Sequence, residues 1–152
     1  MNKLRKSLMS LALGELTAAC VFLAVYLIYL DFGTASLLAI LCLDFMLLQG
    51  AAYWLFRYRF IDREKRLAAR KTLAFLRVAD VLLLCIVMAL IIVLAHDARD
   101  MIVGALILVF AVIEYINYYW VRLSYGKSGF NLAILFRTGL KPSSIRKLLK
   151  RK

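Results

Sequence analysis

Four long apolar runs occupy most of this chain and constrain its fold more than any other feature. They cover residues 11–30, 35–56, 73–95 and 101–121, and a helix that crosses a bilayer needs about 20 mostly apolar residues. The chain has 152 residues, 64% of them hydrophobic, and a single proline. Soluble domains of this size do not have such a composition. We therefore predict an all-α membrane protein in which residues 1–152 form one domain of four transmembrane helices.

The positions of the cations predict the orientation of these helices. The chain contains 21 Lys and Arg against 9 Asp and Glu. Cations precede the first run, fill the segment between the second and third runs, and follow the fourth run, whereas Arg99 is the one Lys or Arg in the short segments 31–34 and 96–100. By the positive-inside rule, both termini and the central loop are cytoplasmic. The two short outer segments then predict two antiparallel helical hairpins.

The first run also has some features of a secretory signal peptide, because it follows a basic start and has small residues before Cys20. However, Glu15 interrupts its apolar region, and Thr17 stands where a bulky aliphatic residue is expected in a lipoprotein signal. We therefore expect this run to remain in the protein as a membrane anchor.

The motifs of common enzymes and cofactor sites are missing from the sequence. It has no Gly-rich phosphate loop, no G-x-S-x-G and no H-E-x-x-H, and it contains a single histidine. His96 stands beside Asp97 and Asp100, which suggests a metal site, but a polar turn at the membrane surface explains the same residues and is preferred. We predict a protein that is not an enzyme, has no catalytic residues, and holds no metal or cofactor.

Each apolar run contains one acid, namely Glu15, Asp44, Asp80 or Glu114. A carboxyl group inside a bilayer is costly and usually faces protein or trapped water, so it is a candidate functional residue. With a rise of about 1.5 Å per residue, three of the acids lie about 8–11 Å inside the cytoplasmic edge. Asp44 lies near the midplane instead.

Other polar side chains fall at the same depth as Glu15, Asp80 and Glu114. Arg77 precedes Asp80 by three residues and shares its helix face, and a polar stripe on the fourth helix descends from Glu114 towards the cytoplasm. One interpretation is a hydrated pocket that binds an anion or a lipid headgroup. The preferred one is that these groups pair with one another and fix the helix register. The predicted inner-leaflet polar cluster consists of Glu15, Arg77, Asp80, Glu114, Asn117, Tyr118 and Arg122.

Asp44 has no basic residue on its own helix face. A carboxyl group without a counter-charge at this depth is expected to be protonated at neutral pH. It then either donates a hydrogen bond between helices, which we prefer, or carries a transported proton.

The segment 122–152 is basic and contains no acid. Its last residues predict a short basic amphipathic helix, with residues 145, 148 and 149 on one face, that lies on the membrane surface. Positive-inside topology alone would select cations here, but contact with anionic lipid is the simplest functional interpretation. We do not expect nucleic-acid binding, because the segment has no recognisable binding fold. The predicted lipid-binding residues are Arg137, Lys141, Arg146, Lys147, Lys150, Arg151 and Lys152.

Residues 114–125, EYINYYWVRLSY, are followed by basic residues and by SSIRK at 143–147. This part of the chain, mainly residues 114–152, resembles the end of a group of small four-span bacterial membrane proteins, some of which are labelled general stress proteins. The resemblance implies a bacterial cytoplasmic membrane and draws attention to Glu114, Asn117 and Arg122, but it assigns no activity.

Two functional hypotheses follow from the sequence. The first is a non-enzymatic accessory or scaffold protein that acts through helix packing and through a basic cytoplasmic face on anionic lipid, with a second copy or another membrane protein as its partner. The alternative is a small oligomeric proton-coupled transporter or channel that uses the intramembrane acids, which requires water to reach Asp44. A lipid-modifying enzyme ranks third, because no paired nucleophile and base stands out.

Overall fold

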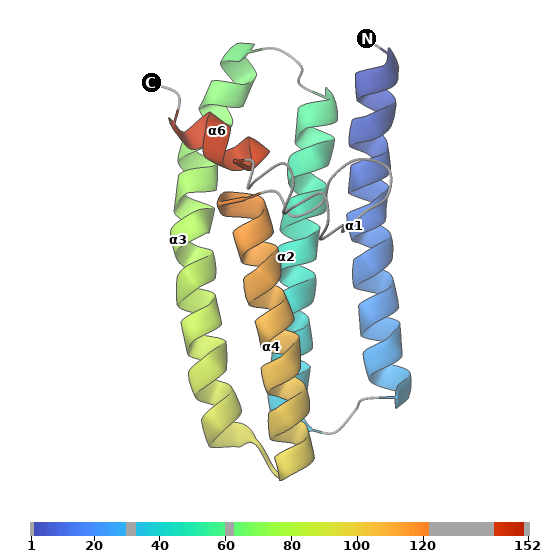
Figure 1. The fold of residues 1–152 in the computed structure, drawn as a ribbon, viewed down its shortest axis with the longest axis vertical. Helices are drawn as coiled ribbons and strands as arrows, with labels where there is room; N and C mark the ends of the chain where they lie inside the picture. The colour runs from blue at the N-terminus through green and yellow to red at the C-terminus, as the bar shows by residue number, and fades with distance from the viewer. Residues whose placement is uncertain (1, 30–32, 60–62, 122–141, 151–152) are drawn as a thin grey trace, which may run out of the picture.

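The structure, a computed structural model, describes residues 2–29, 33–59, 63–121 and 142–150. Four of its helices are long and apolar enough to cross a membrane, so the predicted class of all-helical, multi-pass membrane protein is confirmed. A short helix near the C-terminus lies against one end of the four (Figure 1). The helices are α1 (Asn2–Tyr29), α2 (Thr34–Arg59), α3 (Arg63–Leu94), α4 (Ala98–Tyr119) and α6 (Ser144–Lys150).

Two of the long helices extend beyond their predicted spans towards the same end of the bundle. α1 begins at Asn2 rather than near residue 11, and α3 begins at Arg63, as the helix-forming residues before its apolar run predict. The 32 residues of α3 correspond to about 48 Å of helix, which exceeds the roughly 30 Å of a hydrocarbon core. The candidate membrane span of α3 is Ala69–Leu94, so the first turns of the helix lie before that span.

α2 is the central helix of the bundle. It packs against α1, α3 and α4, and it lies between α1 and α3 in Figure 1. Of its most apolar 18 residues 61% are buried, compared with 17%, 22% and 28% for α1, α3 and α4. Close packing with α4 depends on small residues, because a Cβ at Gly104 would lie 3.3 Å from the backbone of Ala35. The other three long helices, α1, α3 and α4, therefore gain much of their packing from contact with α2.

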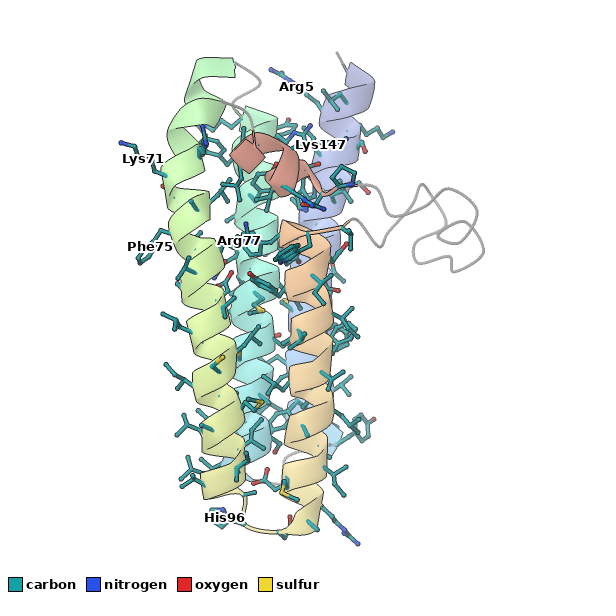
Figure 2. The ribbon with its side chains drawn as sticks, turned by 60° about the vertical axis from the view of Figure 1, so that its left-hand side comes forward. Arg5, Lys71, Phe75, Arg77, His96 and Lys147 are labelled. Atoms are coloured by element: carbon teal, nitrogen blue, oxygen red, sulfur yellow. The ribbon has the colours of Figure 1, made fainter. Side chains whose placement is uncertain are left out.

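The outer surfaces of α1, α3 and α4 are apolar. Phe75 and Ile92 on α3 are each 71% exposed, and Leu106 on α4 is 65% exposed. Figure 2 shows Phe75 pointing away from the bundle. In water such surfaces would aggregate, whereas acyl chains cover them in a bilayer.

One end of the bundle, called here the basic end, carries the N-terminus, the start of α3 and α6. Figure 2 shows Arg5, Lys71 and Lys147 near this end and His96 at the other. Among the described side chains, Arg99 is the one Lys or Arg at the end opposite. The described cations of the basic end are Arg5, Lys6, Arg57, Arg59, Arg70, Lys71, Arg77, Arg146 and Lys147.

The opposite end is held together by Asp100, which we expected in a polar turn facing water. It is fully buried instead, in the first turn of α4. Its carboxylate accepts backbone hydrogen bonds from Ser36 N to Oδ1 (2.8 Å) and from Ala35 N to Oδ2 (3.2 Å), at the start of α2. The first N–H groups of a helix have no intrahelical acceptor, so an acid from a neighbouring helix can cap them. Tyr26 of α1 hydrogen bonds to the Ser36 hydroxyl (2.9 Å) and joins this connection.

Candidate functional site

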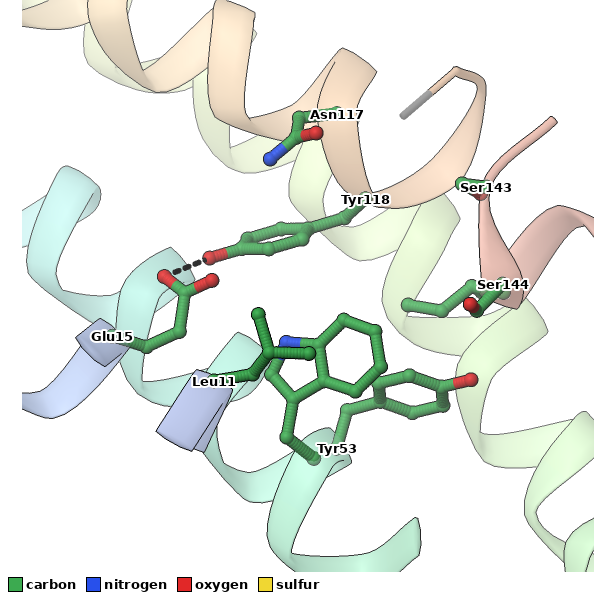
Figure 3. Close-up of a pocket in the computed structure, with 9 residues that line it drawn as sticks. Leu11, Glu15, Tyr53, Asn117, Tyr118, Ser143 and Ser144 are labelled. Carbon is green, nitrogen blue, oxygen red and sulfur yellow. Dashed lines mark hydrogen bonds between the residues drawn. The ribbon is translucent and has the colours of Figure 1, made fainter. Parts of the chain in front are cut away.

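A small cavity near the basic end, lined by polar as well as apolar side chains, brings together residues that are far apart in the sequence. Tyr118 of α4 donates a hydrogen bond of 2.6 Å from its hydroxyl group to Glu15 Oε2 of α1, and Figure 3 shows the two side chains pointing towards each other. The cavity has a volume of about 90 Å³, which is enough for several water molecules. We refer to it as the Glu15 cavity. It is lined by Leu11, Glu15, Tyr53, Trp54, Asn117, Tyr118, Ser143, Ser144 and Ile145.

Gly50 of α2 makes room for the central side chain of this cavity. A Cβ atom at position 50 would overlap the hydroxyl group and ring of Tyr118. The absence of a side chain therefore lets Tyr118 cross the face of α2 and reach Glu15. We did not identify this role from the sequence, where Gly50 is an isolated glycine near the end of an apolar run.

The segment around α6 closes one side of the cavity. Ser143 N donates to Trp120 O (3.3 Å), and Ser143 Oγ accepts from Arg146 N (3.0 Å). Ile145 is 5% exposed and joins the core, and Leu148 and Leu149 pack against it. The apolar face of this helix was predicted to meet the membrane surface. In the structure this face contacts α3 and α4 instead.

Asp80 of α3 forms a second hydrogen-bonded centre inside the bundle. It is 2% exposed, and its Oδ1 accepts from Gln49 Nε2 of α2 at 2.8 Å. The hydroxyl group of Tyr119 also donates to this carboxylate. Neutral donors from α2 and α4 therefore satisfy Asp80.

Arg77 does not provide the partner that we expected for Asp80. Its guanidinium Cζ lies 4.7 Å from the ring centroid of Trp120, a cation–π contact on the outer side of α3. Asp80 points into the bundle instead, towards Gln49. Residues three apart on a helix share a face only approximately, so one can face the core and the other the surface.

Glu114 accepts a hydrogen bond from Asn117 Nδ2 on the same helix (3.2 Å). It also lies close enough to Glu15 to interact with it electrostatically. The predicted pairing of Glu114 with Arg122 stays a prediction, because Arg122 lies outside the described residues. The described part of the predicted cluster thus forms two centres, one at Glu15 with Tyr118 and one at Asp80, with Arg77 outside both.

Asp44 is 8% exposed, and within the described part of the chain its buried Oδ1 has no hydrogen-bond partner. It belongs to a stripe on α2 formed by residues 36, 40, 47, 51, 54 and 58, at the spacing of one helix face. This stripe faces α1, because Ser36 contacts Tyr26 and Tyr58 lies under the guanidinium of Arg5. The expected hydrogen bond between helices is therefore not made at Oδ1.

Three polar residues have roles that the sequence patterns did not predict. Gln49 binds Asp80, Asp100 caps α2, and the buried indole N–H of Trp54 lies near the Glu15 carboxylate without hydrogen-bond geometry to it or to any other described atom. A polar residue inside an apolar run is the signal that identifies Gln49. The burial of Asp100 depends on how α4 meets the start of α2, which no local pattern reveals.

Of the predicted lipid-binding residues, two have described side chains. Lys147 is exposed, and the Cζ of Arg146 lies 5.8 Å from the ring centroid of Trp120. Lys150 ends α6, but its side chain is not described. Arg137, Lys141, Arg151 and Lys152 lie outside the described residues.

The chemistry that the described side chains of this arrangement offer is hydrogen bonding and charge. Among the described residues, no group of three His, Cys, Asp or Glu side chains is close enough to hold a metal ion. The chain is a small multi-pass membrane protein with buried acids and a basic end. It matches no protein-family model, no curated protein and no solved structure.

Proposed function

We propose that this protein is a non-enzymatic accessory or scaffold protein of a bacterial cytoplasmic membrane, with both termini in the cytoplasm and a basic end that engages anionic lipid. The distribution of Lys and Arg supports this orientation. The lipid partner is supported by the negative potential of cytoplasmic leaflets, which attracts cations close to the membrane.

The observation that carries the proposal is that four arginines of the basic end lie over aromatic rings. Their Cζ atoms lie 4.7–5.9 Å from the ring centroids. A cation–π contact is made with the ring and not with a hydrogen-bond acceptor, so guanidinium N–H groups remain available to phosphate oxygens. The pairs are Arg5 with Tyr58, Arg57 with Trp54, and Arg77 and Arg146 with Trp120.

The proposal predicts that anionic lipid is enriched around the basic end. The two tryptophans of the chain, Trp54 and Trp120, both belong to this end and serve as fluorescence probes. In vesicles of mixed composition, brominated phosphatidylglycerol should quench them more than brominated phosphatidylcholine does, because each engaged cation contributes about 1 kcal/mol, roughly a fivefold enrichment. High salt should reduce the difference.

Variants of exposed cations test this measurement, and a cation at the opposite end provides the matched control. Replacing Arg59 and Lys71 with Gln should reduce the preference for phosphatidylglycerol, whereas Arg99→Gln at the opposite end should leave it unchanged. Equal quenching by the two brominated lipids at low salt would contradict the lipid part of the proposal. Crosslinking in native membranes tests the scaffold part, because a chain that forms no crosslink to itself or to another membrane protein has no scaffolding role.

A proton-coupled transporter or channel is the second candidate, and the Glu15 cavity together with the unsatisfied Oδ1 of Asp44 supports it. Asp44 lies ten residues from Trp54, which corresponds to about 15 Å along α2. Leu47 and Ala51 on the same stripe are 2% and 1% exposed, so a water path must pass a closely packed region. Proteoliposomes subjected to a pH jump should show proton flux that is lost in Asp44→Asn. Flux that persists in this variant, or is absent from the wild type, would exclude a proton path through Asp44.

A further inference from the structure

A long shallow groove runs along the outer surface of α3 beside α4 and α6, away from the Glu15 cavity. Its volume is about 610 Å³. Arg70 lines the end nearer the basic end, Arg77, Val78 and Trp120 line the middle, and Val81 and Leu82 line the other end. The groove therefore combines two arginines with apolar side chains.

We propose that this groove binds one anionic phospholipid, with its phosphate at Arg77 and Arg70 and an acyl chain along α3. The inference deepens the proposed function and rests on it, because it requires the basic end to lie in a leaflet that contains anionic lipid. It adds a defined site to the general attraction that nine described cations would exert on such a leaflet.

The charge of Arg77 is the first argument for this ligand. Arg77 lies within the apolar part of α3, Ala69–Leu94, where an arginine costs about 2.5–3.5 kcal/mol at the helix centre and is normally paired. Among the described residues, its guanidinium contacts the ring of Trp120 and no carboxylate. The nearby acid, Asp80, is buried and engaged by Gln49 and Tyr119. A lipid phosphate in the groove supplies the missing counter-charge.

The surroundings of Trp120 strengthen this argument. Arg146 of α6 approaches the same ring at 5.8 Å, and its Nη1 lies 3.5 Å from Trp120 O. Two guanidinium groups from different helices thus share one aromatic ring. Arg146 does not itself line the groove, but an anion beside the Trp120 ring is attracted by both positive charges.

The dimensions of the groove fit one leaflet. The groove follows α3 for twelve residues from Arg70 to Leu82, about 18 Å. The five residues beyond Arg77 correspond to about 7.5 Å, which is half of the roughly 15 Å of one leaflet's hydrocarbon. The groove leads from the basic end towards the middle of the membrane, as a lipid of that leaflet does. Val78, Val81 and Leu82 are 60%, 40% and 58% exposed, so an acyl chain can contact them.

Native mass spectrometry of the full chain in detergent, with added phosphatidylglycerol or phosphatidylcholine, tests this site. We expect one phosphatidylglycerol to stay bound to each chain and phosphatidylcholine to bind more weakly. Arg77→Gln should weaken the binding of phosphatidylglycerol by roughly tenfold to a hundredfold, the effect of losing charge-assisted hydrogen bonds. Val78→Trp should also weaken this binding, because the indole fills the path of the acyl chain.

Val78→Trp keeps the test valid if Arg77→Gln fails to fold, since position 78 is 60% exposed. Its matched control is Ile92→Trp, a larger side chain at a 71% exposed position of the same helix outside the groove, which should retain the lipid. The inference would be overturned if Arg77→Gln and Val78→Trp both retained phosphatidylglycerol as the wild type does. It would also be overturned if inorganic phosphate displaced the lipid, because that result would indicate a site for the anion alone. In either case the salt-dependent quenching of Trp54 and Trp120 would persist if only the defined site is wrong, and it would be absent if the proposed function is wrong.

Discussion

Replacing Asp100 with Ala should destabilise the bundle more than the loss of an ordinary helix cap. The carboxylate of Asp100 accepts the N–H groups of Ala35 and Ser36, and both residues are 0% exposed. The alanine variant leaves two buried donors without an acceptor, and each such group costs about 1–3 kcal/mol. Loss of a negative charge at the start of a helix adds about 0.3–1 kcal/mol. Because water can enter at the end of the bundle, we expect the lower part of this range, about 2–4 kcal/mol.

Asp100→Asn separates the shape of this side chain from its charge. The amide keeps one acceptor oxygen but presents an NH₂ group to the second backbone N–H, so we expect a smaller loss of about 1–2 kcal/mol. Asp97→Ala is the matched control, because Asp97 caps α4 by accepting from Asp100 N (2.7 Å) and is exposed. Its removal should cost about 1 kcal/mol.

The free energy of unfolding can be measured by titrating the detergent-solubilised protein with sodium dodecyl sulfate and following helical circular dichroism. Gly33 gives a further check, because a Cβ there would lie 2.6 Å from Asp100 Oδ2. Gly33→Ala should therefore cost less in the Asp100→Ala background than in the wild type. The capping role would be refuted if Asp100→Ala lost no more stability than Asp97→Ala, and the close contact would be refuted if the effects at 33 and 100 were additive.

Two more predictions concern the buried acids and use the same unfolding assay. The hydrogen bond between Glu15 and Tyr118 can be tested by a double-mutant cycle of Glu15→Gln and Tyr118→Phe. The expected coupling energy is about 0.6–1.7 kcal/mol, the range of interhelical hydrogen bonds in membranes. Strictly additive losses would show that the two side chains do not interact. Gln49→Leu should lower the free energy of unfolding by about 1–3 kcal/mol, because it removes a donor from the buried Asp80. Combining it with Asp80→Leu should recover part of this lost stability. A double variant less stable than either single variant would contradict the pairing.

The sequence predicts the helices of this protein better than the contacts between them. Composition identifies the four spans, and helical rise places Glu15, Asp80 and Glu114 at a common depth, where Tyr118 and Tyr119 then connect to the first two. The central position of α2 could not be predicted, because lipid-facing and protein-facing leucines look alike in a bilayer.

The partners of the acids were also beyond the sequence, for a related physical reason. Helical spacing suggested that Arg77 pairs with Asp80, but spacing gives the face of one helix and not the neighbour that this face meets. Gln49 reaches Asp80 from α2, which depends on how α2 and α3 are rotated about their axes. Tyr118 reaches Glu15 because Gly50 lacks a side chain, and this requires knowledge of three helices together.

The structure separates the two signs of charge in a way that bears on function. Asp80 is buried inside the bundle and Glu15 is half-buried beside a cavity. Neutral donors hold both carboxylates, namely Gln49, Tyr119 and Tyr118, so arginines do not serve as their partners. Arg5 and Arg77 lie over aromatic rings instead, at cation–π distance. Had each buried acid been paired with an arginine, the chain's formal net charge of +12 would be the same, but fewer guanidinium groups would be available at the surface. Hydrogen bonding the acids internally thus keeps the cations of the basic end available, which supports the proposal that this end recognises anionic lipid while the acids serve helix packing.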